Sequence, residues 1–296
     1  MAQAAAALQA AANAMLGVEG PGIALPINES CTVNEAVNEF LRAKARAGRS
    51  DRYLQALRVS LRSFARARSG TALTAVTVTE LEKWMQNSNW GPRTQRGYLS
   101  DVRTLFNFAV RRGLATQNPA AAVELPVCDQ PAPSIHTPEQ ASKVLELARQ
   151  TDLNLCRCLA VRYFAGLRSS EAARLRESEI KDGFIEVTAS NSKTRRRRLV
   201  TVQPALSAWL ALGGALPLHD VNNRHRWFSA ALRQKHEILW THNVTRHSFV
   251  SYHLAHFQSA AKTALEAGHT EQMLFTHYRE LVTPDSAAKY WALRPA

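Results

Sequence analysis

The chain has 296 residues, enough for two ordinary domains, and its hydrophobic content of 46% is typical of a folded protein rather than a disordered one. Its 37 lysines and arginines outnumber 24 aspartates and glutamates, and the resulting formal charge of +13 favours a polyanionic partner, nucleic acid before an anionic membrane. No apolar run of about 18 residues exists to span a bilayer, no signal peptide is recognisable, and four cysteines are too few for a disulfide scaffold. We therefore expect a cytoplasmic protein without membrane contact.

The first part of the chain is predicted to be helical. Residues 1–30 form an Ala-rich tail, and residues 31–125 have the apolar periodicity of a small all-α domain with four helices. A capping-box pattern at residues 79–82 predicts the start of its shortest helix. The apolar stripes of the other three helices are Val33, Val37, Phe40 and Leu41; Leu54, Leu57, Leu61 and Phe64; and Leu99, Val102, Leu105, Phe106 and Ala109.

Two of these helices carry arginines on their other face. Few carboxylates lie between the arginines, so the faces are not salt-bridged surfaces of the usual i,i+4 kind. They are either solvated surfaces or DNA-binding surfaces, and we favour DNA binding. The arginines concerned are Arg58, Arg62 and Arg66 on one helix and Arg93, Arg96 and Arg103 on another.

A proline-rich stretch separates this domain from the next. Residues 126–138 contain four prolines, so residues 126–137 are predicted to be an extended linker. The second domain, residues 138–296, begins with a helix-start signal at Thr137 and Pro138. Residues 184–188 and 199–202 read as two strands around a polar turn, and the rest is helical. The predicted fold class is therefore mainly α, with a small antiparallel sheet in an α+β second domain.

Four segments of the second domain carry residues suited to phosphodiester chemistry. Cleavage of a phosphodiester without a metal needs a nucleophile, cations for the non-bridging oxygens and an acid for the leaving oxygen. Residues 165–171 read Ala-Gly-Leu-Arg-Ser-Ser-Glu, residues 191–194 read Asn-Ser-Lys-Thr, and residues 243–249 read Asn-Val-Thr-Arg-His-Ser-Phe. Residues 267–269 read Ala-Gly-His, and Tyr278 follows nine residues after the histidine. In this order and spacing the segments resemble the boxes of tyrosine recombinases of the phage-integrase type.

The resemblance covers the chain from about Thr32 to Tyr278 and implies both fold and activity. It implies a helical core-binding domain and an integrase-type catalytic domain that together clamp duplex DNA. It also implies metal-independent cutting and rejoining through a 3′-phosphotyrosyl intermediate, with no cofactor. By this resemblance Arg168 and Arg246 bind the phosphate, Glu171 supports Arg168, and His269 donates a hydrogen bond to the phosphate. Lys193 is the acid for the leaving oxygen, and Tyr278 is the nucleophile. The remaining implied DNA contacts are Arg195, Arg196, Arg197 and Arg198.

The sequence departs from the family pattern at one position. Asn243 stands where the family has a histidine, and His242 is one residue earlier. Asparagine is a good helix N-cap, and residues 244–257 look helical. Its amide could also donate a hydrogen bond to a phosphate oxygen, but it cannot accept a proton near neutral pH as imidazole does.

Further expectations concern assembly and alternatives. If the family's behaviour carries over, two protomers bind an inverted-repeat site and four assemble at synapsis. The C-terminal segment, with Ala287, Tyr290, Trp291 and Leu293, packs either on a neighbouring protomer or on its own domain. The alternatives are a recombinase-fold DNA-binding protein that no longer cuts, a type IB topoisomerase-like enzyme and, more remotely, a helical transcription regulator. The Cys156-x-Cys158 pair has no second pair at zinc-ligand spacing, and His253-x-x-His256 lacks the glutamate and the spacing of a zinc-protease helix, so we expect no metal site.

Overall fold

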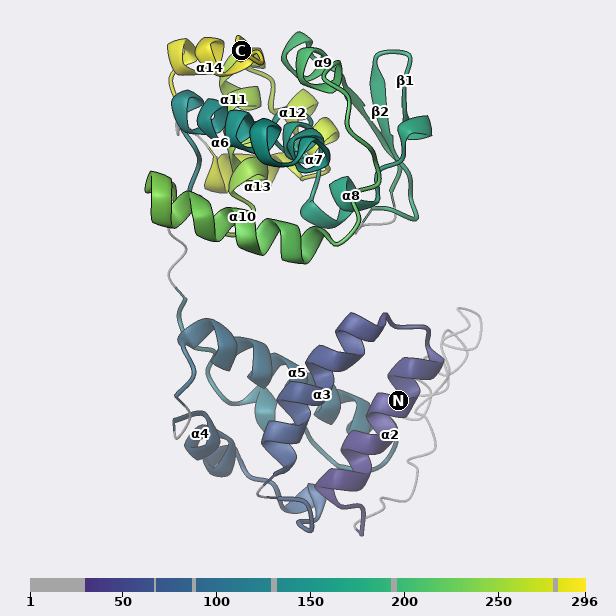
Figure 1. Ribbon diagram of the computed structural model, residues 1–296. Coiled ribbons are helices and arrows are strands. Elements are labelled where there is room, and N and C mark those ends of the chain that lie inside the picture. Colours follow the sequence, from purple (N-terminus) through teal and green to yellow (C-terminus); the bar gives the residue numbers. More distant parts are fainter. Residues whose placement is uncertain (1–29, 67, 87–88, 129–131, 193–195, 279–281) are drawn as a thin grey trace, which may run out of the picture. The chain divides into compact units, whose positions relative to one another are not determined.

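The computed structural model describes residues 30–66, 68–86, 89–128, 132–192, 196–278 and 282–296 (Figure 1). The chain divides into two compact units, residues 1–130 and 131–296. The predicted tail, residues 1–30, lies almost wholly outside the described residues. Within the described part, no helix has both the length and the apolar character that crossing a membrane requires.

The described part of the first unit is helical, as the periodicity predicted. Every residue of the three apolar stripes is buried except Leu41, which is half-buried. Phe40, Phe64, Phe106 and Phe108 lie in the core, where their rings pack edge-on or tilted against one another and against Trp84. The helices are α2 (Val33–Arg46), α3 (Asp51–Ala65), α4 (Val78–Gln86) and α5 (Pro92–Arg111), with short 3-10 helices η1 (Leu73–Ala75) and η2 (Pro119–Ala121).

The start of α4 differs from the prediction by two residues. The capping box is formed by Thr77 and Glu80 rather than by residues 79–82, because the Thr77 backbone N–H donates to Glu80 Oε2 at 2.9 Å and the Glu80 N–H donates to Thr77 Oγ1 at 3.3 Å. Residues 77–80 and residues 79–82 both read Thr-x-x-Glu, so either pair could form a capping box. Only the backbone conformation decides which threonine precedes the first turn.

In its described residues the second unit is mostly helical with one three-stranded antiparallel sheet, which confirms the predicted fold class. The sheet has the order β1-β2-β3, and its centre pairs Ile185 with Val200, both fully buried. The short strand β1 was not predicted. The elements are α6 (Pro138–Thr151), α7 (Leu153–Phe164), α8 (Ser169–Arg174), η3 (Glu177–Glu179), β1 (Ile180–Lys181), β2 (Phe184–Val187), β3 (Arg198–Thr201), α9 (Pro204–Leu210), α10 (Val221–His236), α11 (Val244–Phe257), α12 (Ala260–Ala267), α13 (Glu271–His277) and α14 (Pro284–Trp291).

Helix α7 lies at the centre of this unit and contacts α6, α9 and α11 (Figure 1). Its residues from Leu155 onwards are almost all buried, including Cys156 and Cys158 at 1% exposure each. Burial raises the pKa of the Cys156 thiol to about 12 and that of Cys158 to about 11, so neither is a reactive thiolate.

The C-terminal helix α14 packs on its own unit, against α11 and α6. The Tyr290 hydroxyl donates to the Tyr163 carbonyl at 2.6 Å, and Trp291 Nε1 donates to the Tyr252 carbonyl at 3.2 Å. Tyr290 also stacks on Tyr252 with ring centroids 4.0 Å apart. The sequence left open whether this segment packs on a neighbouring protomer or on its own domain. In the structure of this single chain it packs on its own domain.

Candidate active site

The glycine of the Gly-Leu-Arg segment makes the turn that places Arg168. Gly166 has a φ of +61°, and a Cβ at this position would lie 2.2 Å from Cδ1 of Phe249, so a larger residue does not fit. Arg168 directly precedes α8. Its Nη1 donates to Glu171 Oε1 at 2.8 Å, and its Nη2 donates to the Gly268 carbonyl at 3.1 Å. Two elements far apart in the sequence therefore fix this guanidinium.

Glu171 is the buried carboxylate of an ion cluster that joins Arg168 to Arg198. Its side chain has an exposure of 0%, and Arg198 Nη2 donates to Glu171 Oε2 at 2.7 Å. Burial by itself raises the pKa of Glu171, but the hydrogen bond and charge of Arg198, together with the bonds from Arg168, lower this pKa to about 2. One ionised carboxylate thus holds two guanidinium groups.

The position of Arg198 corrects one of the predicted DNA contacts. Its side chain is only 5% exposed, and its Nε donates to the Glu266 carbonyl at 2.9 Å. Since side chains alternate along a strand, the first residue of β3 faces the core and Leu199 faces outward. Arg196 and Arg197 are exposed, and Arg197 pairs with Glu186 at 2.7 Å. Arg195 lies outside the described residues.

Arg246, on the first turn of α11, is buried beside this cluster with an exposure of 3%. Its guanidinium donates to the carbonyls of Gly166 and Ala267. Burial, and then the charge of Arg168, lower the pKa of Arg246 to about 9, which leaves the group charged at neutral pH.

The C-terminal end of α12 therefore binds three arginines with three successive carbonyls. Glu266 accepts from Arg198, Ala267 from Arg246, and Gly268 from Arg168. These carbonyls lack partners within the helix and form the negative end of its dipole, so they are suitable acceptors for cations. Gly268 has a φ of +64°, and a Cβ there would lie 3.3 Å from the Arg198 side chain. A glycine is the residue that closes this helix with least strain.

His269 follows this turn and is half-buried. Burial, and then the charges of Arg246 and Arg168, lower the pKa of His269 to about 3, so the ring is neutral at physiological pH. Its Nδ1 is buried without a hydrogen-bond partner. The ring lies 6.0 Å from the ring of Tyr278, centroid to centroid.

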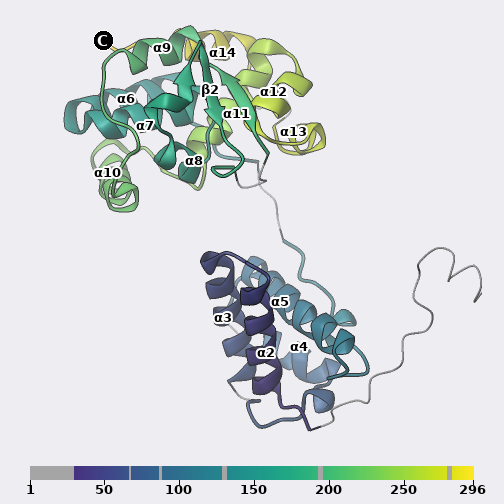
Figure 2. The same ribbon diagram turned by 90° about the vertical axis from the view of Figure 1, so that its right-hand side faces the viewer.

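Tyr278 caps the C-terminal end of α13 and has an exposure of 5%. Burial raises the pKa of Tyr278, and the charge of Arg246 only partly opposes this effect. The phenolic oxygen lies 2.6 Å from Nδ1 of His247, the residue after Arg246. Figure 2 shows α12 and α13 next to α11, an arrangement that brings these residues together.

His247 is a site residue to which the sequence analysis gave no role. A signal was present, because the histidine stands inside the segment at residues 243–249 that carries the resemblance. Its neighbour Arg246 was selected for its charge, but no local pattern shows that a residue 31 positions further along contacts the ring.

Of the remaining predicted site residues of this unit, those that the structure describes make no side-chain hydrogen bond to the arginines at the end of α12. Asn243 occupies the predicted N-cap position of α11, but it has a φ of +59° and makes no side-chain cap hydrogen bond. Asparagine is one of the few residues that adopt this left-handed conformation readily, and this is a sufficient structural reason for its presence. His242 is exposed. Lys193 lies outside the described residues.

The arginines of the first unit differ in their surroundings. Arg62, Arg66, Arg93 and Arg96 are exposed, and Arg58 is half-buried. Arg103 corrects the prediction of a DNA contact, because its guanidinium donates to the carbonyls of Ala120, Ala121 and Val123 and so ties α5 to the segment around η2.

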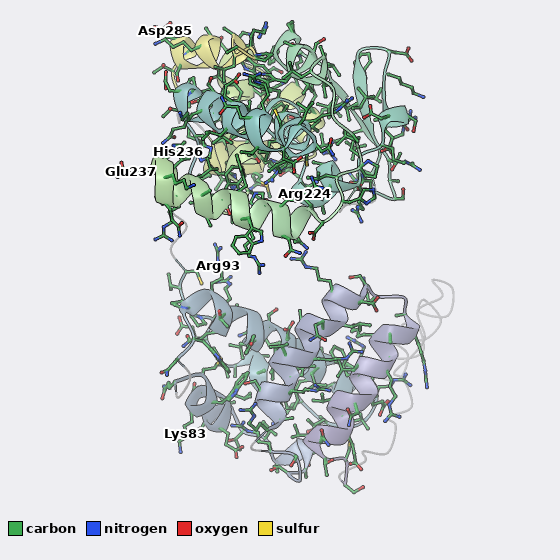
Figure 3. The ribbon with its side chains drawn as sticks, viewed as in Figure 1. Lys83, Arg93, Arg224, His236, Glu237 and Asp285 are labelled. Carbon is green, nitrogen blue, oxygen red and sulfur yellow. The ribbon has the colours of Figure 1, made fainter. Side chains whose placement is uncertain are left out.

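Helix α10 adds a basic surface that the sequence analysis did not single out. Its only buried residue is Leu232, and the helix itself contains no acidic residue. Figure 3 shows Arg224 near its first turn and His236 at its end, with Glu237 just beyond. Arg224 pairs with Asp152 at 2.5 Å. Trp227 is 70% exposed, and the exposed basic residues of the helix are Arg226, Arg233 and Lys235.

Among the described residues, histidine, cysteine and carboxylate side chains form no group of three that could hold a metal ion. The cations that the structure describes in the site are the guanidinium groups of Arg168, Arg198 and Arg246.

Individual sequences and solved structures resemble this chain. The sequence matches no protein-family model. It is 25% identical over 274 residues to the tyrosine recombinase XerD of Xanthomonas campestris pv. campestris, covering 80% of this chain and 84% of that protein. Its fold is similar to that of a λ integrase (residues 75–356) dimer bound to a COC′ core site, with a TM-score of 0.72, 15% identity, and coverage of 84% and 96%. A λ integrase tetramer bound to a Holliday junction gives a TM-score of 0.70 at 16% identity, with coverage of 90% and 83%.

Proposed function

We propose that this chain is a tyrosine recombinase of the integrase family and that it cuts and rejoins duplex DNA through a covalent bond between Tyr278 and a 3′ phosphate. The observation that carries the proposal is the convergence of Arg168, Arg246, His269 and Tyr278 at the end of α12, although they span positions 168 to 278.

The proposed chemistry follows from the charges of this cluster. Attack on a phosphodiester gathers negative charge on the non-bridging oxygens, and fixed cations stabilise that charge best where water is excluded. Arg168 and Arg246 supply the cations and are held in place before DNA arrives. Neutral His269 has one ring N–H with which to bind the same phosphate. Lys193 is proposed as the acid for the 5′ leaving oxygen on the resemblance alone.

DNA binding is proposed to involve both units. The exposed arginines on α3 and α5 and the exposed basic residues of α10 are available for phosphate contacts, which dominate affinity for duplex DNA. By analogy with the dimeric and tetrameric λ integrase complexes, we propose two protomers per inverted-repeat site and four at synapsis.

Replacement of Tyr278 by Phe tests the proposal. The variant should form no covalent adduct and should bind DNA with nearly unchanged affinity, because one phenolic oxygen contributes little to the electrostatic term. The substrate is a nicked suicide duplex carrying a site first selected from random duplexes by affinity. The measurement is a denaturant-stable protein–DNA band.

Each outcome separates one alternative. An adduct that persists in Tyr278→Phe places the nucleophile elsewhere, and no adduct with the wild-type chain indicates a binding protein that no longer cuts. Relaxation of supercoiled DNA without exchange between two defined sites would instead identify a topoisomerase-like enzyme.

A further inference from the structure

The tyrosine has a histidine partner that is not at the position where the resemblance places one. Asn243 occupies that position and makes no side-chain cap hydrogen bond. His247, one helical turn further along α11, has its Nδ1 2.6 Å from the phenolic oxygen of Tyr278. The two rings are 5.6 Å apart between centroids and inclined by 34°. The contact is thus a short hydrogen bond to the atom that would attack phosphorus.

The fold gives successive residues of α11 different surroundings. Neighbouring residues on an α-helix point about 100° apart. Arg246 points inward to the carbonyls of Gly166 and Ala267, whereas His247 is half-buried and meets the end of α13. The bond from the Tyr278 N–H to the Leu274 carbonyl at 2.9 Å fixes its backbone at the end of α13, and the residue is only 5% exposed, so its ring is packed at this place.

The tyrosine needs a base, and its other neighbours are poorly suited to that role. Burial raises the pKa of Tyr278, so the phenol gives up its proton less readily than a free tyrosine. Arg246 and Arg168 are cations without an acceptor atom. The pKa of His269 is lowered to about 3 by burial and then by these two arginines, which makes its ring a weak base. Asparagine has no basic nitrogen.

We propose that His247 is the general base that removes the phenolic proton of Tyr278 during strand cleavage, an inference that rests on the proposed function. The proton passes from the tyrosine oxygen to Nδ1 as the oxygen forms its bond to phosphorus. The bond from phosphorus to the 5′ oxygen breaks, and that oxygen takes a proton from a separate acid. In rejoining, the 5′ hydroxyl attacks phosphorus and gives its proton back to the conjugate base of that acid, while the bond from phosphorus to Tyr278 breaks and protonated His247 returns its proton to the phenolate.

The first test measures single-turnover cleavage of the suicide duplex by His247→Gln and His247→Ala. Loss of the base should slow cleavage by ~10²-fold or more, within the range of general base catalysis. Affinity for the duplex, measured for each variant, should stay within a few-fold and also shows that the variant is folded. His242→Ala is the matched control, because this exposed histidine of the preceding loop should leave the rate unchanged.

Three further readouts separate a base from a residue that only positions the tyrosine. Wild-type cleavage should slow as pH falls and His247 becomes protonated, and His247→Gln should lose this acid limb. Added imidazoles should rescue His247→Ala with a rate that rises with the pKa of the imidazole. A duplex with a 5′-bridging sulfur, which needs no leaving-group acid, should restore Lys193→Ala but not His247→Gln.

Cleavage by His247→Gln within a few-fold of wild type, with an unchanged pH profile, would overturn the proposal. A slow variant that keeps the acid limb and is not rescued by imidazoles would also overturn it, and would make His247 a positioning residue. Failure of the proposed function looks different, because the wild-type chain then forms no adduct or Tyr278→Phe still forms one.

Discussion

Arginines of the two units have opposite surroundings. In the first unit, Arg62 on α3, Arg66 at its C-cap, and Arg93 and Arg96 on α5 are exposed. In the second unit, Arg198 and Arg246 are buried and Arg168 is 19% exposed, and all three donate to the carbonyls that end α12. The difference shows that a basic residue type does not determine its role. A buried guanidinium requires acceptors and becomes part of the scaffold, whereas an exposed one keeps donors in contact with solvent, where a ligand can reach them.

Arg103 shows that the same rule applies in the first unit. It shares a helix with exposed Arg93, yet it is half-buried and donates to the carbonyls of Ala120, Ala121 and Val123 as the second-unit arginines do at α12. Exposed Arg96 lies between these cases, with a bond from Nη1 to the Pro126 carbonyl at 3.4 Å. The role of an arginine therefore depends on its burial and its acceptors rather than on the unit to which it belongs.

The largest effect is expected for Arg198→Met. Removing one partner of a buried ion pair costs up to about 3–5 kcal/mol, and Glu171 would keep only Arg168 as the partner of its buried charge. The free energy of unfolding, measured in urea with hydrogen exchange of α8 to identify the second unit, should fall by that amount. The matched control is Arg197→Met, which removes an arginine that is 64% exposed and should cost less than about 1 kcal/mol. Equal losses for the two variants would contradict the distinction.

A similar effect is expected from acid. The pKa of Glu171 is lowered to about 2, below its usual value of about 4.3, so the unfolded state binds the proton more readily than the folded state. The stabilisation is therefore complete above about pH 5 and is lost as pH falls toward about 2, by up to about 3 kcal/mol. Urea unfolding across this range checks the slope. Glu171→Gln should reduce the slope, and Glu186→Gln, which loses the partner of exposed Arg197, should leave it unchanged.

The smallest effect on stability, with a clear effect on binding, is expected for Arg62→Ala and Arg66→Ala. Exposed substitutions usually change the free energy of unfolding by less than about 0.5 kcal/mol. Each lost phosphate contact should reduce the slope of log affinity against log salt by about 0.9. Titration of duplex DNA at several salt concentrations measures this change. Arg103→Ala should instead lower stability and leave the slope as it is; the reverse pattern would assign Arg103 to DNA.

Much of the fold was predictable because helices and strands leave periodic patterns of apolar residues. The three apolar stripes of the first unit are core residues except for half-buried Leu41, and α6 starts at Pro138 after Thr137 as predicted. The strand β1 was missed because two residues are too few to show alternation. The start of α4 was misplaced because neighbouring threonines compete for one cap.

The sequence by itself determined the two helical regions, the proline-rich stretch between them, and the residue types around Arg168, Arg246, His269 and Tyr278, since these depend on composition and local spacing. Only the tertiary structure decided that Arg198 is scaffold, and that His247 rather than Asn243 contacts the tyrosine. The reason is physical. A hydrogen bond between residues 27 or 31 positions apart depends on how helices pack, and no local pattern records the direction in which a side chain then points.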